Sequence, residues 1–184
     1  QTLEGTNQRG PWNQEGIWHL RHEAQPAWSL PPVDHIGSGP SGLTYYPGLG
    51  LPSRYDDHFF LCDFRGSVPA SSVLSFALEP DGAGFRMVDL HPIVSNVLAT
   101  DVEFGYDNRM YIADWVKGWN STETGRIHVV HDPEFDPGSG SPTSTSDLFR
   151  NGFDSRSTGE LLQLLAHPDM RVRLRSQFEL AGRG

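Results

Sequence analysis

Seven polar or aromatic side chains stand at the ends of short apolar segments, where the loops of a sheet protein gather binding and catalytic groups. They are His35, Ser41, Asp63, Arg65, Asp101, Asp114 and Trp115. Histidine acts as a general base near neutral pH, and carboxylate and hydroxyl oxygens bind hard cations. Arginine binds carboxylates through two parallel hydrogen bonds. These residue types together favour a site for a small polar molecule.

Composition narrows the classes of protein and of partner. The chain has 184 residues with 20 Gly, 14 Pro and a formal charge of −9, which favours short strands and excludes nucleic acid as the expected partner. No apolar run approaches the roughly 18 residues needed to span a bilayer, and no signal peptide opens the chain. If a longer parent is exported, we expect its signal upstream of Gln1 and a periplasmic or extracytoplasmic location.

The single cysteine limits redox chemistry within this chain. Cys62 lies in the apolar run 59–62, so the sequence predicts a buried core thiol, with a reactive thiol as the alternative. One cysteine excludes an internal disulfide and a C-x-x-C-H haem attachment, so no haem site is expected in this chain.

The elements that must position these residues are short strands. Residues 42–46, 57–63, 72–78 and 84–89 each combine apolar or alternating patterns with flanking turn residues. Four strands joined by hairpins form one antiparallel sheet, which is the unit of a propeller blade. The pattern begins again at residues 100–105, 109–115 and 125–130, although no clear fourth strand follows.

The two groups of strands also match in sequence. Residues 40–45 align with 99–104, and residues 59–64 align with 110–115, at the same place in the strand order. We therefore predict a mainly β fold of two antiparallel four-stranded propeller-type blades, a partial β-propeller, over residues 41–132. An irregular N-terminal segment, residues 1–40, precedes the blades.

The C-terminal residues have a helical character. A linker is expected over residues 133–156, and residues 157–184 are expected to form a short α-helical HEAT-like hairpin. Ser157 and Glu160 have the spacing of a capping box, and leucines follow it over residues 161–165. Pro168 is predicted to begin the second helix. One such repeat cannot bury its own apolar face, so a neighbouring repeat is expected.

Four runs of sequence carry a resemblance to a known family: RGPWNQE at 9–15, GSGPSGLTYYPG at 37–48, FFLCDFRG at 59–66 and ATDVEFG at 99–105. They resemble the planctomycete-type large membrane-bound dehydrogenase-like proteins. In that family a propeller similar to glucose and sorbosone dehydrogenases precedes HEAT-type repeats and a cytochrome c module. The resemblance implies that this chain is the propeller-to-HEAT segment of such a parent.

The activity implied by the resemblance is oxidation of a sugar-like alcohol or aldehyde by a quinone-dependent dehydrogenase. Its cofactors would be pyrroloquinoline quinone (PQQ) and Ca²⁺, and electrons would leave to the cytochrome c module of the parent. The earlier blades and the haem motif are not in this chain, and most of the quinone pocket is expected from the missing residues.

The resemblance assigns His35, as a general base, and Asp63 to catalysis, and it assigns Arg65, Asp114 and Trp115 to cofactor binding. Position in a propeller makes Asp101 and Ser41 candidate metal ligands, because the loops entering the innermost strands converge on the central channel.

Each of these assignments has a structural alternative. Asp101 caps backbone amides in the alternative reading, while Asp63 and Arg65 form a local surface ion pair. His35 then lies in an exposed loop. Trp115 and Trp119, which flank a loop and could stack on a sugar, then serve hydrophobic packing.

Two other functional classes remain open from the sequence. A lactonase-like hydrolase would use a channel Ca²⁺ at Asp101 to polarise a lactone carbonyl, without a redox acceptor. A non-catalytic scaffold would need the folded blades but no catalytic or cofactor-binding residues. Two blades leave sheet edges exposed, so we expect either the remainder of a parent chain or a homo-oligomer, for example three copies closing a six-bladed ring.

Overall fold

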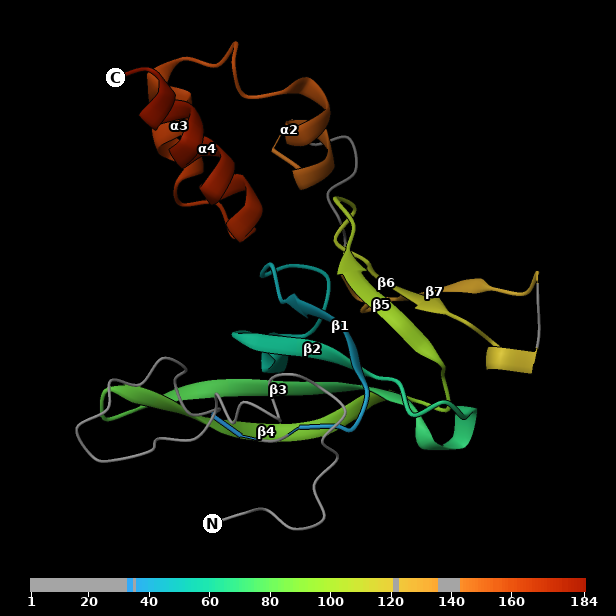
Figure 1. The fold of residues 1–184 in the computed structure, drawn as a ribbon. Coiled ribbons are helices and arrows are strands. Elements are labelled where there is room, and N and C mark those ends of the chain that lie inside the picture. Colours follow the sequence, from blue (N-terminus) through green and yellow to red (C-terminus); the bar gives the residue numbers. More distant parts are fainter. Residues whose placement is uncertain (1–32, 35, 121–122, 136–142) are drawn as a thin grey trace, which may run out of the picture. The chain divides into compact units, whose positions relative to one another are not determined.

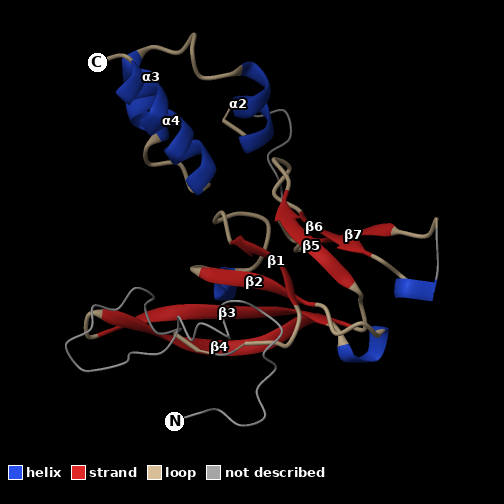
Figure 2. Ribbon diagram, viewed as in Figure 1, coloured by secondary structure: helices blue, strands red, loops and turns tan. Residues whose placement is uncertain are grey.

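The computed structural model describes residues 33–34, 36–120, 123–135 and 143–184. The chain divides into two compact units, residues 1–35 and 36–184, and every described helix and strand belongs to the second (Figure 1). The predictions for residues 1–32 and for His35 lie outside the described residues. The described part is mainly β, with two antiparallel sheets and three α-helices (Figure 2).

The first sheet has four strands in the order β1-β2-β3-β4. They are β1 (Pro40–Tyr45), β2 (His58–Asp63), β3 (Ser72–Asp81) and β4 (Gly84–Ser95). Hairpins join neighbouring strands, as the alternating pattern and the turn residues predict. The last strand runs past the predicted end at residue 89, because register shifts let its second half continue pairing with the start of β3, where Ser72 faces Ser95.

The second sheet has three strands among the described residues, β5 (Ala99–Phe104), β6 (Met110–Asp114) and β7 (Arg126–Val130). The prediction of four strands in this sheet is wrong for the described residues. After β7 the chain forms a turn in which the Phe135 amide donates to the Asp132 carbonyl, 3.1 Å away. Pro133 lies inside this turn and has no amide proton to offer to a sheet ladder.

The two sheets repeat one pattern of backbone pairing. Pro40 faces Asp63 in the first sheet as Ala99 faces Asp114 in the second, and a register shift follows immediately in both β1 and β5. The residue after each aspartate makes an equivalent backbone hydrogen bond to the residue before the first strand. The Phe64 amide donates to the Gly39 carbonyl, and the Trp115 amide donates to the Leu98 carbonyl. The internal repeat predicted from sequence is therefore present in the hydrogen bonding.

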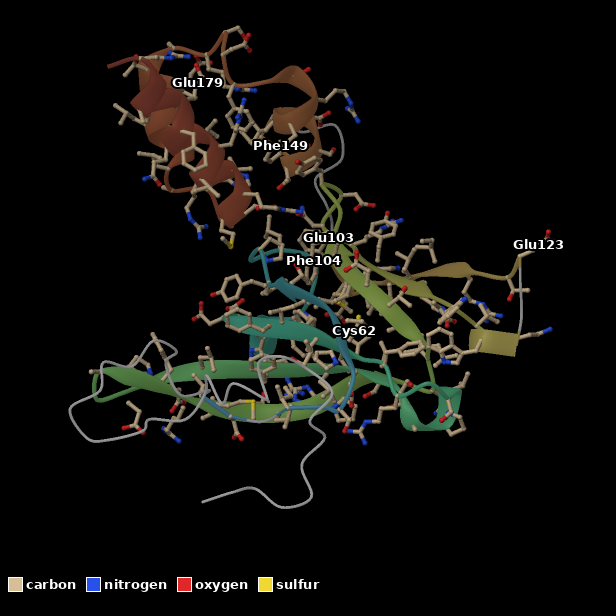
Figure 3. The ribbon with its side chains drawn as sticks, in the orientation of Figure 1. Cys62, Glu103, Phe104, Glu123, Phe149 and Glu179 are labelled. Atoms are coloured by element: carbon tan, nitrogen blue, oxygen red, sulfur yellow. The ribbon has the colours of Figure 1, made fainter. Side chains whose placement is uncertain are left out.

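The sheets pack together around one shared core. Phe60, Cys62 and Val73 from the first sheet meet residues of the second, which are Ala99, Val102, Phe104, Met110 and Ile112. Figure 3 labels Cys62 and Phe104, one from each sheet. At Gly42 a Cβ atom would lie 2.7 Å from the Asp101 Cα, so β1 approaches β5 this closely because residue 42 has no side chain.

Cys62 is the buried core thiol that the sequence predicts. Its side chain is fully buried and makes no disulfide. Burial, assisted by the nearby Asp101 carboxylate, raises the pKa of the Cys62 thiol to about 12. A thiol in this environment is not ionised near neutral pH, so nothing favours reactive chemistry there.

The helical part contains α2 (Thr145–Asn151), α3 (Thr158–Leu164) and α4 (Met170–Gly182). The first of these lies inside the predicted linker, where the Ser144 hydroxyl accepts the Asp147 amide and begins the helix. The capping box of Ser157 and Glu160 is confirmed. Pro168 does not begin the second helix, because Asp169 is its N-cap and Met170 its first residue.

The three helices form a small core of their own. Leu148, Phe153, Leu161, Leu164 and Val172 are buried together. The hairpin of α3 and α4 thus uses α2 as a packing partner.

A buried polar network joins these helices to the second sheet. Arg171 donates to the carbonyls of Phe104 at 2.6 Å and Gly105 at 3.1 Å, and to the side chain of Asn108 at 3.0 Å. The carboxylate of Asp169, which is 0% exposed, pairs with Arg171 at 2.7 Å. Within the part of the chain described here, no helix is long and apolar enough to cross a membrane.

Candidate functional site

Asp63 closes the loop that leads into β1. One carboxylate oxygen accepts the amides of Ser38 and Gly39 at 2.8 and 3.0 Å, and the other accepts the Arg65 Nε at 2.6 Å. The residue is 1% exposed. A carboxylate held by three donors fixes the backbone around it, and in this geometry Asp63 acts as a positioning residue.

Asp114 has the equivalent place in the second sheet. One of its oxygens accepts the amides of Leu98 and Val116 at 3.2 and 2.8 Å. The other lies 2.9 Å from the Nε2 of His128, and the Nε of Arg126 is 3.9 Å away. Each sheet therefore uses an aspartate at the end of its second strand to hold the segment before its first strand.

Both aspartates have lowered pKa values. Burial opposes ionisation, but at Asp63 the amides of Ser38 and Gly39 and the Arg65 guanidinium outweigh it, and the pKa falls below its usual value. At Asp114 hydrogen bonds from His128 and from the Val116 amide likewise outweigh burial and lower the pKa.

These shifts predict acid sensitivity. A carboxylate whose folded pKa is below its unfolded value, about 3.9 for Asp, stabilises the fold above that value. The contribution disappears as pH falls through the folded pKa. We expect Asp114→Asn to lower the free energy of unfolding at pH 7 and to flatten its decline below about pH 4, measured by urea denaturation across pH. Asp81→Asn, an exposed change, should leave the profile unaltered.

The loops that follow β2 and β6 meet through aromatic side chains. Phe64 stacks on Trp115 with ring centroids 5.8 Å apart, and Trp119 meets Trp115 edge-on at 4.6 Å. Trp119 is 74% exposed. Arg65 lies in the first of these loops and is about half exposed at its side chain. The predicted cofactor residues Arg65, Asp114 and Trp115 thus lie at the same end of the two sheets.

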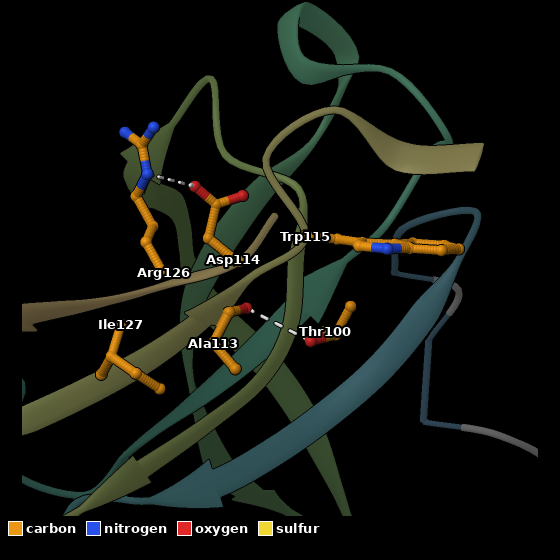
Figure 4. A pocket seen from close by; sticks show the side chains of 7 residues that line it. Thr100, Ala113, Asp114, Trp115, Arg126 and Ile127 are labelled. Carbon is orange, nitrogen blue, oxygen red and sulfur yellow. Dashed lines mark hydrogen bonds and ion pairs between the residues drawn. The ribbon is translucent and has the colours of Figure 1, made fainter. Parts of the chain in front are cut away.

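An open hollow of about 640 Å³ lies at this end of the second sheet (Figure 4). Thr100, Asp114, Trp115, Arg126 and Ile127 line it. It presents an aromatic side chain, an exposed guanidinium and an apolar strand surface, a combination that suits a planar or ring-shaped polar ligand. Arg126 is the cation of this hollow, and its side chain is 58% exposed.

The two predicted metal ligands have hydrogen-bond partners in the protein. The Ser41 hydroxyl donates to the Ala99 carbonyl at 3.1 Å, and the Asp101 carboxylate accepts the amide of Val102 at 2.9 Å. The strand registers align Ser41 with Thr100 and Gly42 with Asp101, so the two predicted ligands are not at equivalent positions. In the described residues there is no group of three or more His, Cys, Asp or Glu side chains placed to hold a metal ion.

The sequence patterns did not single out Arg126 or His128. Alternation along β7 places Arg126 and His128 on one face, and Arg126 faces Asp114 across the β6–β7 pair. That signal could be used only once the register of the two strands was known. The prediction for His35 stays a prediction, since this residue lies outside the described ones.

Comparison of the chain with protein-family models, with curated proteins and with solved structures finds no match.

Proposed function

We propose that the two sheets are consecutive blades of a β-propeller and that α3 and α4 are the first HEAT-type helix pair. The observation that supports the blades is the repeated pairing scheme. In each sheet the aspartate that ends the second strand, Asp63 or Asp114, accepts a backbone amide of the segment before the first strand. Face-to-face packing of the two sheets around a shared core is the arrangement of neighbouring blades.

We further propose that the blades belong to a quinone-dependent sugar or alcohol dehydrogenase-like protein. The ligand-binding end is the one at which Arg65, Trp115 and Arg126 lie. PQQ is planar and carries carboxylates, and guanidinium groups beside aromatic rings fit both properties. When bound, the quinone supplies the acceptor for the hydride of the substrate.

The residues of this chain then bind and orient. Arg126 pairs with a carboxylate of the ligand, and Trp115, which lines the hollow and is in contact with Trp119, offers an apolar surface to its ring. Asp63 and Asp114 hold the loops that carry these side chains. Because the described residues offer no group of three metal ligands, we derive no step through Ca²⁺. The general base at His35, the sugar-like substrate and the cytochrome c module of a parent chain stay part of the proposal.

The test is a titration of the chain with PQQ in which the quenching of tryptophan fluorescence is measured at each addition. We expect saturable quenching. Arg126→Gln should raise the dissociation constant roughly 10-fold to 100-fold, because a hydrogen bond to a charged group contributes about 1.5–3 kcal/mol. Asp114 keeps its bonds to Leu98, Val116 and His128 in this variant, so the fold is retained.

Arg86→Gln is the matched control, since Arg86 is an exposed arginine of β4 paired with Glu79. It should bind the quinone as the unchanged chain does. Quenching that does not saturate, or equal affinity in the two variants, would overturn the cofactor assignment. Turnover of a lactone without any electron acceptor would instead favour the hydrolase.

A further inference from the structure

Among the described residues, each sheet has one face that packs against the other sheet and an opposite face whose side chains are more exposed. The first sheet packs through Thr44, Phe60, Cys62, Val73 and Ser75, which share a face because they are register partners across β1, β2 and β3. The opposite face of this sheet is the Leu43 face, defined as Leu43, Tyr45, Phe59, Leu61, Leu74 and Phe76.

The Leu43 face is equivalent to a face that is already buried in the second sheet. In the repeated register Leu43 takes the place of Val102, Tyr45 that of Phe104, and Leu61 that of Ile112. Those three residues of the second sheet are in the shared core, each at most 4% exposed. Leu43 is 57% exposed, Tyr45, Phe59, Leu74 and Phe76 are half-buried, and Leu61 is 7% exposed.

The second sheet has the reciprocal surface, the Ile127 face, defined as Asp101, Glu103, Tyr111, Ala113, Ile127 and Val129. Here Tyr111 takes the place of Phe60, Ala113 that of Cys62 and Ile127 that of Val73. Those three residues of the first sheet are fully buried against the second. Ile127 is 64% and Val129 46% exposed. An exposed apolar patch of this kind marks a contact surface.

We propose that the Ile127 face of one chain docks on the Leu43 face of a second copy, head to tail, in the manner in which the two sheets pack inside one chain. We name a second copy as the partner because the Ile127 face and the Leu43 face are equivalent to the two surfaces that pack on each other between the sheets of one chain. Such a contact is heterologous, so it closes into a ring or continues from copy to copy. Ile127 also lines the hollow proposed for the quinone, whereas Leu43 lies outside it, so the Leu43→Lys variant tests assembly separately from quinone binding.

The test is mass in solution by light scattering over a range of concentrations. The unchanged chain should form species of two or more copies. Ile127→Lys and Leu43→Lys should each reduce the mass to one copy at the same concentration, because each places a charge in the apolar contact. Leu162→Lys is the control, since Leu162 is a 56% exposed leucine of α3 that lies on neither face.

Mixing the two single variants separates this contact from a symmetric one. The Ile127→Lys chain keeps an intact Leu43 face and the Leu43→Lys chain keeps an intact Ile127 face, so an equimolar mixture should form a heterodimer of twice the chain mass. Circular dichroism checks that both variants stay folded. An unchanged chain that is monomeric at all concentrations overturns the proposal, and so does a mixture of the variants that stays monomeric.

Discussion

Replacing Arg171 with alanine should lower the free energy of unfolding by about 3–5 kcal/mol, the range found when one partner of a buried ion pair is removed. The Asp169 carboxylate is fully buried and would lose its cation. The carbonyls of Phe104 and Gly105 would lose a donor at the same time. The guanidinium also lies 5.3 Å from the centre of the Tyr106 ring, a cation–π contact that the substitution removes.

Urea denaturation followed by circular dichroism measures this effect, with Arg175→Ala as the control on the same helix. Arg175 is exposed, so its loss should change the free energy of unfolding by less than about 0.5 kcal/mol. Equal stability of the two variants would show that the network of Arg171 does not hold the helices on the second sheet.

Replacing Gly50 with alanine should destabilise the fold by more than about 3 kcal/mol, which combines backbone strain with the displacement of a neighbouring backbone. Gly50 has a φ of +107°, which L side chains rarely adopt. A Cβ atom would lie 1.6 Å from the carbonyl oxygen of Asn108. Because Asn108 also bonds Arg171, the clash would disturb the polar network as well.

The matched glycine is Gly159, which lies in α3 and where a Cβ would meet no atom within 4 Å. Gly159→Ala should therefore stabilise the chain by up to about 1 kcal/mol, the helix propensity difference between the two residues. Thermal unfolding of both variants compares them directly. A Gly50→Ala variant that melts with the unchanged chain would contradict the close approach of the loop to residue 108.

The strands were predictable from sequence because local patterns specify them. The apolar run that became β2, the alternation of β5 and the repeat of the pattern at β6 placed those strands within one or two residues of their observed bounds. The capping box of Ser157 and Glu160 located α3 in the same way. In each case the signal lies within a few residues of the element.

Features that depend on pairing or on distant residues were not predictable. The register shifts after Pro40 and Ala99 are of this kind, because no local signal announces them. The alignment of residues 40–45 with 99–104 already places Asp101 opposite Gly42, so the choice of Ser41 as its equivalent was an error of the sequence interpretation. The helix α2 was missed because the stretch before it, residues 133–145, is rich in Pro, Gly, Ser and Thr, although Ser144 and Asp147 carry a capping signal. The place of Arg126 beside Asp114 follows from a pairing that joins two strands across a loop.

A nuclear Overhauser contact between Phe60 and Phe104 tests most directly whether the two sheets pack on each other around one core. These rings come from different sheets and their centroids are 5.6 Å apart. We expect a cross-peak between their ring protons that disappears in Phe104→Leu. A Phe60 ring whose cross-peaks all come from protons of the first sheet would contradict the packing.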